Sequence, residues 1–501
     1  MPGHRQRRAQ RAGLLDAGGA RHGGREAGSR PEEGELMRRT EIAVVGAGPA
    51  GLSAAVSAAR AGARVTLIDR YTQPGGQYFR QFPLGFRAAS GPGWGDDEAQ
   101  GRKLLAGLQM KNLEVLCDTA VFDAKADGTL ELATADHSFA LQAEKLILAT
   151  GASERVIPFP GWTLPGVFTA GGLQNLVKTQ RILPGRRIAV AGSGPLLYAV
   201  AALLIDAGAE VVALVEAGQP AEAAKHWPSL FANRTLAFAG ARYLSKLWRT
   251  GVPVLSRHAI LQAEGKGQLE RVAVGKLDAE WHPQARPPTY FEVDALGLNF
   301  GFLPSIELAR LLGCQIVFRP PLGGYTVAHN ARMETSRPGI FVAGEAAGIG
   351  GASIAMLQGE MAGLAAAQQL EYLSEAQAEQ HLRVLGRRLA RQERFRDAMN
   401  AVFGLRPGIY DLIRDDTIVC RCEEATRAAI IRAAMESTPS LREVKCRTWA
   451  GMGSCQGRFC AETIQHLTAE ALGVSVADLS FPRVRPPLGT VPVAALLEER
   501  P

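Results

Sequence analysis

One segment near the N-terminus constrains the fold of this chain more than any other. A short apolar run, residues 41–45, leads into the turn Gly46-Ala47-Gly48-Pro49-Ala50-Gly51, and an alanine-rich stretch follows to Ala61. A second apolar run, residues 63–68, ends in Asp69. This order of strand, Gly-x-Gly-x-x-Gly turn, helix, strand and acid is typical of a dinucleotide-binding fold.

Each residue of the turn has a predicted role. Gly46 permits the tight turn, Gly48 lets the backbone approach a pyrophosphate, and Gly51 lets the helix pack closely on the strand. The helix that begins at Pro49 and Ala50 offers free N–H groups and a partial positive charge to the phosphates. We expect Asp69 to accept hydrogen bonds from a ribose.

A second copy of the pattern begins at residue 188. An apolar run ends in Gly192-Ser193-Gly194, a helix is predicted to about Ala207, and the strand 211–215 ends in Glu216. Leu197 replaces the third glycine, so we expect wider helix–strand packing. Glu216 suits a free ribose 2′-OH and repels a 2′-phosphate, which favours NAD(H) over NADP(H). The alternatives are a vestigial nucleotide fold or one that holds a non-redox adenine nucleotide.

Two later segments complete this pattern. Residues 145–151 form an apolar strand that ends in Ala149-Thr150-Gly151, and residues 339–345 form another that ends in Gly344-Glu345. Together with the two turns, they resemble the glutathione-reductase-like flavoprotein superfamily. The resemblance implies that the strand before Thr150 and Gly151 connects two domains, and that Gly344 and Glu345 bind the ribityl chain of FAD. Most members have Asp where this chain has Glu345, and the extra methylene changes the reach of the carboxylate.

The glycines at 348–351 lead into a predicted helix through about Leu370. If its N-terminus lies beneath the flavin, it stabilises negative charge on the reduced ring; the alternative is an ordinary core helix. Many members of the superfamily reduce disulfides through a cysteine pair beside the flavin, but neither nucleotide-binding segment contains one. A loop with Gly76 and Gln77 stands there instead and could approach FAD. Disulfide reduction is therefore disfavoured.

Four of the seven cysteines gather near the C-terminus, at Cys420, Cys422, Cys455 and Cys460. A helix is predicted between the two pairs, about Arg427 to Met435. Such clustering in a large chain indicates metal binding in a reducing compartment. Thiolates at this spacing can surround a [2Fe-2S] cluster or a zinc ion, and the flavin domain upstream favours the cluster. Unliganded cysteines are a third option, and Cys446 is a spare thiol.

The cysteine segment resembles bacterioferritin-associated-ferredoxin-like [2Fe-2S] domains. The whole of residues 37–501 resembles the FAD-containing α (A) subunit of heteromeric bacterial amine dehydrogenases. That family includes D-hydroxyproline dehydrogenase, opine oxidases, dye-linked proline dehydrogenases and cyanide-forming glycine dehydrogenase. The resemblance implies electron relay through FAD and [2Fe-2S] from a β subunit that resembles an amino-acid-oxidase flavoprotein. A small ferredoxin-like subunit is a further candidate partner.

Two other functions stay open: a self-contained NADH-dependent flavoprotein reductase that passes electrons to its own cluster, and a non-catalytic assembly subunit with structural nucleotides. No acid–base pair stands out, because His226, His258 and His282 each occur singly. The catalytic residues are therefore unknown at this stage.

The predicted fold class is α/β, with two Rossmann-like dinucleotide-binding domains and a small α-rich [2Fe-2S] domain. The expected organisation runs in chain order. It comprises a disordered or mis-assigned tail (1–36), an FAD-binding domain (37–155 and 290–370), an NAD-type nucleotide-binding domain (156–289), a helical linker (371–415), the [2Fe-2S] domain (416–482) and a C-terminal tail (483–501). For residues 1–36, a true start at Met37 is one interpretation and an arginine-rich transit peptide is another.

Charge and hydropathy exclude other classes. The net charge of +7 arises from 56 basic and 49 acidic residues, and no basic stripe with interleaved aromatics is evident, so nucleic-acid binding is not expected. The uncharged runs 156–177 and 188–205 are broken by prolines or explained by a strand and a helix, so no transmembrane segment is predicted. We expect a cytoplasmic location, with membrane association through a respiratory acceptor as an option.

Overall fold

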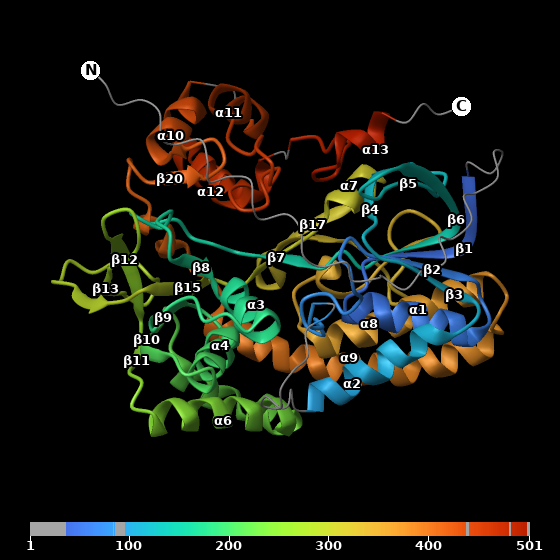
Figure 1. Cartoon of the computed structure of the whole chain (residues 1–501), viewed down its shortest axis with the longest axis horizontal. Helices are drawn as coiled ribbons and strands as arrows, with labels where there is room; N and C mark the ends of the chain where they lie inside the picture. The colour runs from blue at the N-terminus through green and yellow to red at the C-terminus, as the bar shows by residue number, and fades with distance from the viewer. Residues whose placement is uncertain (1–36, 84, 86–95, 437–439, 480–481, 498–501) are drawn as a thin grey trace, which may run out of the picture. The chain divides into compact units, whose positions relative to one another are not determined.

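The computed structural model describes residues 37–83, 85, 96–436, 440–479 and 482–497. The tail expected at residues 1–36 lies outside the described residues. The α/β fold class with Rossmann-like units and a small C-terminal domain is confirmed, as Figure 1 shows in outline.

The first unit is built on a seven-stranded sheet. Its path runs β3 (Leu113–Leu116), β2 (Val65–Ile68), β1 (Met37–Val45), β6 (Ser138–Leu148), β5 (Thr129–Ala133) and β4 (Ala120–Ala124), with β19 (Ile340–Val342) pairing β6. Strands β1, β2 and β3 are parallel, whereas β4, β5 and β6 are antiparallel. β2 is buried along its whole length, as expected of a parallel strand covered on both faces.

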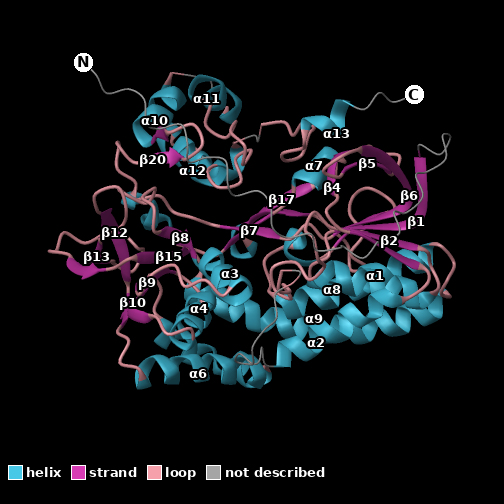
Figure 2. Cartoon of the chain, in the orientation of Figure 1, coloured by secondary structure: helices cyan, strands magenta, loops and turns pink. Residues whose placement is uncertain are grey.

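Helices form a layer beside this sheet, where α1, α8 and α9 run together in Figure 2. Helix α1 (Pro49–Ala61) begins with proline in its first turn and ends at Gly62 in the left-handed conformation. Helix α8 (Ala352–Gln369) crosses it closely. A Cβ at Gly359 would lie 2.0 Å from the Ala50 carbonyl oxygen, so only glycine allows this crossing.

The second unit contains a five-stranded parallel sheet. Its order is β11 (Val254–Ser256), β10 (Glu210–Glu216), β9 (Arg187–Gly192), β15 (Ala295–Asn299) and β8 (Val167–Thr169). Helices α3 (Ala170–Gln180), α4 (Pro195–Asp206), α5 (Trp227–Ala232) and α6 (Arg234–Arg249) belong to this unit. An antiparallel sheet, β12 (His258–Glu264), β13 (Arg271–Lys276) and β14 (Thr289–Glu292), adjoins it.

The second unit extends beyond residue 290, where its end was expected. Strand β15 pairs β9 in the second sheet, so this unit reaches Asn299. The connection back to the first unit is the antiparallel pair of β7 (Ala152–Glu154) and β16 (Phe302–Pro304). The sequence of an apolar strand does not indicate which of two sheets the strand joins. The pair β17 (Ile316–Arg319) and β18 (Gly324–Val327) follows.

Helix α9 (Glu375–Phe403) does more than the expected linker. A capping box formed by Ser374 and Gln377 starts it. Leu382 and Leu385 are buried in the core of the first unit, and Phe403 packs against the core of the second. The helix therefore connects the two units along its length.

The C-terminal module contains β20 (Ile418–Cys420), β21 (Ala425–Thr426), α10 (Arg427–Met435), α11 (Leu441–Thr448) and α12 (Ala461–Leu472). The helix predicted over residues 427–435 is thus confirmed. The module shares one hydrophobic core with the second unit. Two polar contacts fix it there: Arg155 pairs with Glu462 at 2.8 Å, and the Trp162 indole N–H donates to the Ile418 carbonyl at 2.6 Å.

The described part of the C-terminal tail returns to the first unit. The Leu488 N–H donates to the Phe122 carbonyl of β4 at 2.8 Å, and α13 (Val493–Leu497) buries Ala495 against Phe122. The tail also contacts the cysteine module, because the Gln456 amide donates to the Pro487 carbonyl at 2.9 Å. It therefore links the module to the first sheet.

Candidate functional site

The first glycine turn joins β1 to α1 and has the shape that a dinucleotide needs. Gly46 has a φ of +103°, and a Cβ there would lie 2.3 Å from the Ala149 carbonyl oxygen. A Cβ at Gly51 would lie 1.7 Å from the Gly46 oxygen. Neither position has room for a side chain, because helix, strand and the neighbouring β6 end meet here.

Gly48 differs from its neighbours. A Cβ there would find only the Gly76 Cα, 4.0 Å away. Among the described side chains none caps the N-terminus of α1, so its first N–H groups stay available to a ligand. The turn therefore fits a pyrophosphate approaching the helix N-terminus, which is the arrangement that FAD requires.

Asp69 ends β2 beside this turn and is buried. Its carboxylate accepts hydrogen bonds from the Ala47 N–H at 2.6 Å and the Tyr71 N–H at 2.8 Å. Burial raises the pKa of Asp69 above its usual value, and these two N–H donors oppose the shift. The acid is thus held at the turn, where a ribose of the dinucleotide would meet it.

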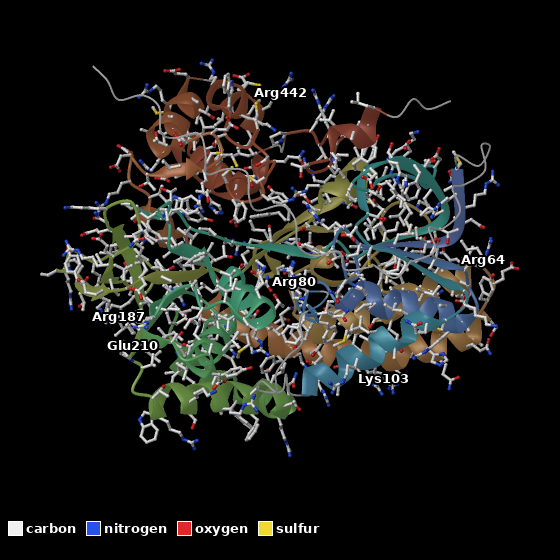
Figure 3. The ribbon with its side chains drawn as sticks, viewed as in Figure 1. Arg64, Arg80, Lys103, Arg187, Glu210 and Arg442 are labelled. Carbon is white, nitrogen blue, oxygen red and sulfur yellow. The ribbon has the colours of Figure 1, made fainter. Side chains whose placement is uncertain are left out.

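The loop with Gly76 and Gln77 packs directly on the glycine turn. A Cβ at Gly76 would lie 2.7 Å from the Gly48 Cα, and Gly76 has a φ of +59°. The Gln77 amide oxygen accepts from Arg80 and from Asn175 of α3, each at 3.0 Å. Arg80, labelled in Figure 3, lies at the centre of that view. The loop therefore bridges the two units at the candidate cofactor site.

Thr150, Gly151 and Gly344 lie on the strand ends that surround the turn. The Thr150 hydroxyl donates to the Ser305 carbonyl at 2.6 Å, and the Ser305 N–H donates to the Gly151 carbonyl at 2.9 Å. The Gly344 N–H donates to the buried Gln358 amide oxygen of α8 at 3.0 Å. Gln358 was not identified from the sequence, because nothing in an alanine-rich helix indicates that one glutamine accepts a hydrogen bond from the backbone of a neighbouring segment.

Glu345 takes a contact that the sequence did not predict. Its carboxylate accepts a hydrogen bond from the Gly351 N–H at 2.8 Å, directly before α8 begins. Burial raises the pKa of Glu345 to about 7, while the Gly351 and Gly350 N–H groups oppose the shift. The longer side chain therefore reaches the N-terminus of α8, the same end that we expected to face the flavin.

The second glycine turn is assembled but covered. Glu216 is fully buried, and its carboxylate accepts from the Gly194 N–H at 3.2 Å and the Gly218 N–H at 2.8 Å. The Ser193 hydroxyl donates to the Phe403 carbonyl at 2.9 Å. A Cβ at Gly218 would lie 3.4 Å from the Phe403 ring.

The end of α9 thus lies over the acid that would bind an adenosine ribose. Gly192 is in place, since its φ is +134° and a Cβ there would lie 1.8 Å from the Asn299 oxygen. The fold of a nucleotide site is present, and Glu216 is buried within it near the end of α9. Sequence reasoning missed this cover because Phe403 lies far along the chain from Glu216.

The four C-terminal cysteines lie close together, because Cys460 interacts with each of the other three. Cys420 accepts a hydrogen bond from the Cys460 thiol, and Cys422 interacts with Cys455. The hydrogen bond from Cys460, with backbone N–H groups of Gly451, Glu423 and Cys422, lowers the pKa of Cys420 to about 5. The same hydrogen bond raises the pKa of Cys460.

The surroundings of these thiols fit a cluster with two irons. Within the part of the chain that the structure describes, no three His, Cys, Asp or Glu side chains converge as ligands of one ion. The four thiols supply the ligands that a [2Fe-2S] cluster takes, two for each iron. A Cβ at Gly453 would lie 2.2 Å from the Cys422 Cβ, so glycine is required beside this ligand. Cys446 is exposed on α11 and is not among these interacting thiols.

Gln456, next to Cys455, is a second residue that sequence reasoning missed. Its amide donates to the Pro487 carbonyl at 2.9 Å and accepts from the Gly489 N–H at 2.8 Å. The backbone of Gln456 has a φ of +52°, so the tail fixes a strained position in the cysteine loop. The adjacent prolines of the tail, Pro486 and Pro487, were the sequence feature that could have indicated this contact.

Comparison with known families agrees with this geometry. The family described as pyridine nucleotide-disulphide oxidoreductase matches residues 40–369. The BFD-like [2Fe-2S] binding domain matches residues 418–470. The cofactors that these families imply, FAD and [2Fe-2S], are those that the first glycine turn and the four thiols fit.

Curated relatives span nearly the whole chain. The HcnB subunit of hydrogen cyanide synthase from Pseudomonas aeruginosa is 33% identical over 90% of this chain and 97% of its own length. The A-type subunit of opine oxidase from Rhizobium meliloti is 31% identical over 93% of this chain and 88% of its own. The alpha subunit of sarcosine oxidase from Rhizobium meliloti is 28% identical over 89% of this chain but only 41% of its own length.

A solved structure shares the fold. L-proline dehydrogenase from P. horikoshii superposes with a TM-score of 0.64 and 20% identity, covering 91% of this chain and 79% of that one. None of the helices in the described part of the chain is long and apolar enough to cross a membrane.

Proposed function

Because the chain belongs to the pyridine nucleotide-disulphide oxidoreductase family and carries a BFD-like [2Fe-2S] binding domain, we propose that it is an electron-transfer subunit. The enzyme would be a heteromeric dehydrogenase or oxidase that acts on the C–N bond of an amino or imino acid. The substrate class is hydroxyproline, proline, opine or glycine. Relatives named as subunits of hydrogen cyanide synthase, opine oxidase and sarcosine oxidase support this proposal.

The observation that carries the proposal is the docking of the cysteine module on the dinucleotide-binding body. The Arg155–Glu462 ion pair and the bond from Trp162 to Ile418 hold the module at the junction of the two units. Flavin accepts two electrons as a hydride and can pass them singly to a one-electron cluster. A rigid connection between the two sites is what such a relay needs.

The chain's own residues support a separate substrate-oxidising subunit. His282, one of the three histidines considered as a base, bonds Asp411 at 2.6 Å in an exposed position. The His258 ring bonds the Ser256 carbonyl. Neither of these two histidines bonds a residue of the first glycine turn. We therefore assign the oxidation to a β subunit that resembles an amino-acid-oxidase flavoprotein, and a small ferredoxin-like subunit is a further candidate partner.

The position of Phe403 argues against the NADH-dependent reductase. A reductase of that kind must bind the adenosine ribose at Glu216, which is fully buried beneath the end of α9. The electrons would then have to enter through the partner rather than through the second nucleotide fold.

The test is to purify the chain alone and with its partner flavoprotein. The isolated chain should contain FAD and [2Fe-2S] yet reduce no dye with proline, hydroxyproline, opine or glycine. Co-expression with an amino-acid-oxidase-like flavoprotein from the same organism should give dye reduction with one of these substrates. Substantial amine-dependent dye reduction by the chain alone would refute the proposal.

A further inference from the structure

Helix α6 carries large apolar side chains that face water. The side chain of Trp248 is 81% exposed, that of Phe238 is 73% exposed and that of Leu244 is 45% exposed. Trp227, at the start of the preceding helix α5, is 66% exposed. Single exposed apolar residues are ordinary, but several on one helix mark an interaction surface.

The spacing along α6 places two of these residues, Leu244 and Trp248, on one face. Ala237, Ala241, Leu244 and Trp248 recur every three or four residues, so they form a stripe along the helix. The core of the second unit is contacted by another side of α6, where Leu247 is fully buried and Tyr243 is partly buried. The side chains of the apolar stripe are therefore not part of the core of the second unit.

The charged side chains of α6 itself are all basic, and one of them, Lys246, pairs with Asp206 of α4. Residues 223–263 contain no Asp or Glu, whereas α6 alone contains Arg234, Arg242, Lys246 and Arg249. At 100° per residue, Phe238, Arg242 and Arg249 form the row beside the apolar stripe. This grouping of basic and aromatic residues appears only at the helical period and is not evident in the linear sequence.

We propose that this face of α6, the α6 stripe with its basic row, binds the surface of an anionic phospholipid bilayer. A helix that lies in the interface inserts Trp, Phe and Leu at the boundary of headgroups and acyl chains, while Arg and Lys contact the lipid phosphates. The amphipathic pattern and the absence of acids over residues 223–263 match this ligand. This inference goes beyond the proposed function and does not depend on it.

The test measures binding of the purified full chain to sedimented vesicles. Vesicles of phosphatidylcholine alone should bind little, vesicles that also contain phosphatidylglycerol should bind strongly, and added salt should weaken that binding. Trp248→Ala should reduce binding roughly tenfold through the lost apolar contact. Arg242→Gln should reduce it about fivefold through the lost attraction to lipid phosphates.

Trp449→Ala is the matched control, because Trp449 is 64% exposed at the end of α11 in the cysteine module. It should bind vesicles as the parent chain does. Flavin content and thermal unfolding verify that each variant is folded. Equal binding to both vesicle types, or binding that Trp248→Ala leaves unchanged, would overturn the proposal. The chain could instead bind no vesicles while Trp248→Ala prevents assembly with the partner flavoprotein. That result would show that this face of α6 binds a protein, and it would also overturn the proposal.

Discussion

Gly48→Ala separates the cofactor role of the first glycine turn from its structural role. Gly48 has a φ of −74° and a ψ of −174°, which is extended backbone open to any residue. The new Cβ would lie 4.0 Å from the Gly76 Cα, with no nearer heavy atom. Within the protein itself, therefore, alanine fits.

The expected magnitudes follow from this geometry. Alanine lowers the entropy of the unfolded chain, a gain of ~0.4–1 kcal/mol, and is a poorer N-cap than glycine, a loss of similar size. The free energy of unfolding without FAD should thus change by less than about 1 kcal/mol. FAD binding should weaken at least about tenfold, because the methyl group keeps the pyrophosphate from charge-assisted N–H bonds worth ~1.5–3 kcal/mol each.

The assay combines the flavin-to-protein ratio after gel filtration with thermal unfolding in the presence and absence of added FAD. A ligand at 100 times its Kd stabilises a protein by about 2.7 kcal/mol, and a tenfold weaker affinity removes about half of that. Gly386→Ala is the matched control: this glycine lies within α9, a Cβ there meets nothing within 4 Å, and flavin content should not change. Gly51→Ala, whose Cβ would lie 1.7 Å from the Gly46 oxygen, should disturb folding as well. A fully flavinylated Gly48→Ala chain, or one that fails to fold without FAD, would refute the reasoning.

Four further outcomes are expected. Serine at any one of the four cluster cysteines should abolish the electron paramagnetic resonance signal of the reduced cluster, whereas Cys446→Ser should keep it; one zinc per chain without iron or sulfide would contradict this assignment. Anaerobic NADH should leave the flavin absorbance unchanged because Phe403 covers the second turn, and rapid bleaching would show that the turn is open. Burial raises the pKa of Glu216 from 4.5 to about 7, so its contribution to stability is full below pH 4.5 and is lost as the pH rises through 7. In urea unfolding, the free energy of unfolding of Glu216→Gln should therefore fall less between pH 4.5 and 7 than that of the parent chain. An equal fall in both proteins would show that Glu216 does not cause this pH dependence. Glu462→Ala removes the ion-pair partner of the buried Arg155 and should lower the free energy of unfolding by roughly 2–4 kcal/mol, a value slightly reduced because Glu462 is partly exposed. The measurement is guanidinium unfolding, and an unchanged midpoint would contradict this prediction.

The sequence by itself determined the local features of this protein. The turn at Gly46–Gly51 could be predicted because close contact between a helix and a strand demands glycine at set positions, whatever surrounds them. Helix α10 begins and ends where its pattern indicated, since Thr426 supplies an N-cap for its backbone. The four thiols were recognisable because few other side chains bind iron and sulfide.

Tertiary structure decided what depends on distant parts of the chain. Nothing local places Phe403 over Glu216, or the tail against Gln456, since each contact joins segments that only the folded core brings together. The same holds for β15, whose apolar residues suit either sheet until pairing with β9 selects one. Glu345 was visible in the sequence, yet its bond to Gly351 depends on where α8 begins. Local pattern thus specifies which groups are available, and long-range packing specifies which of them meet.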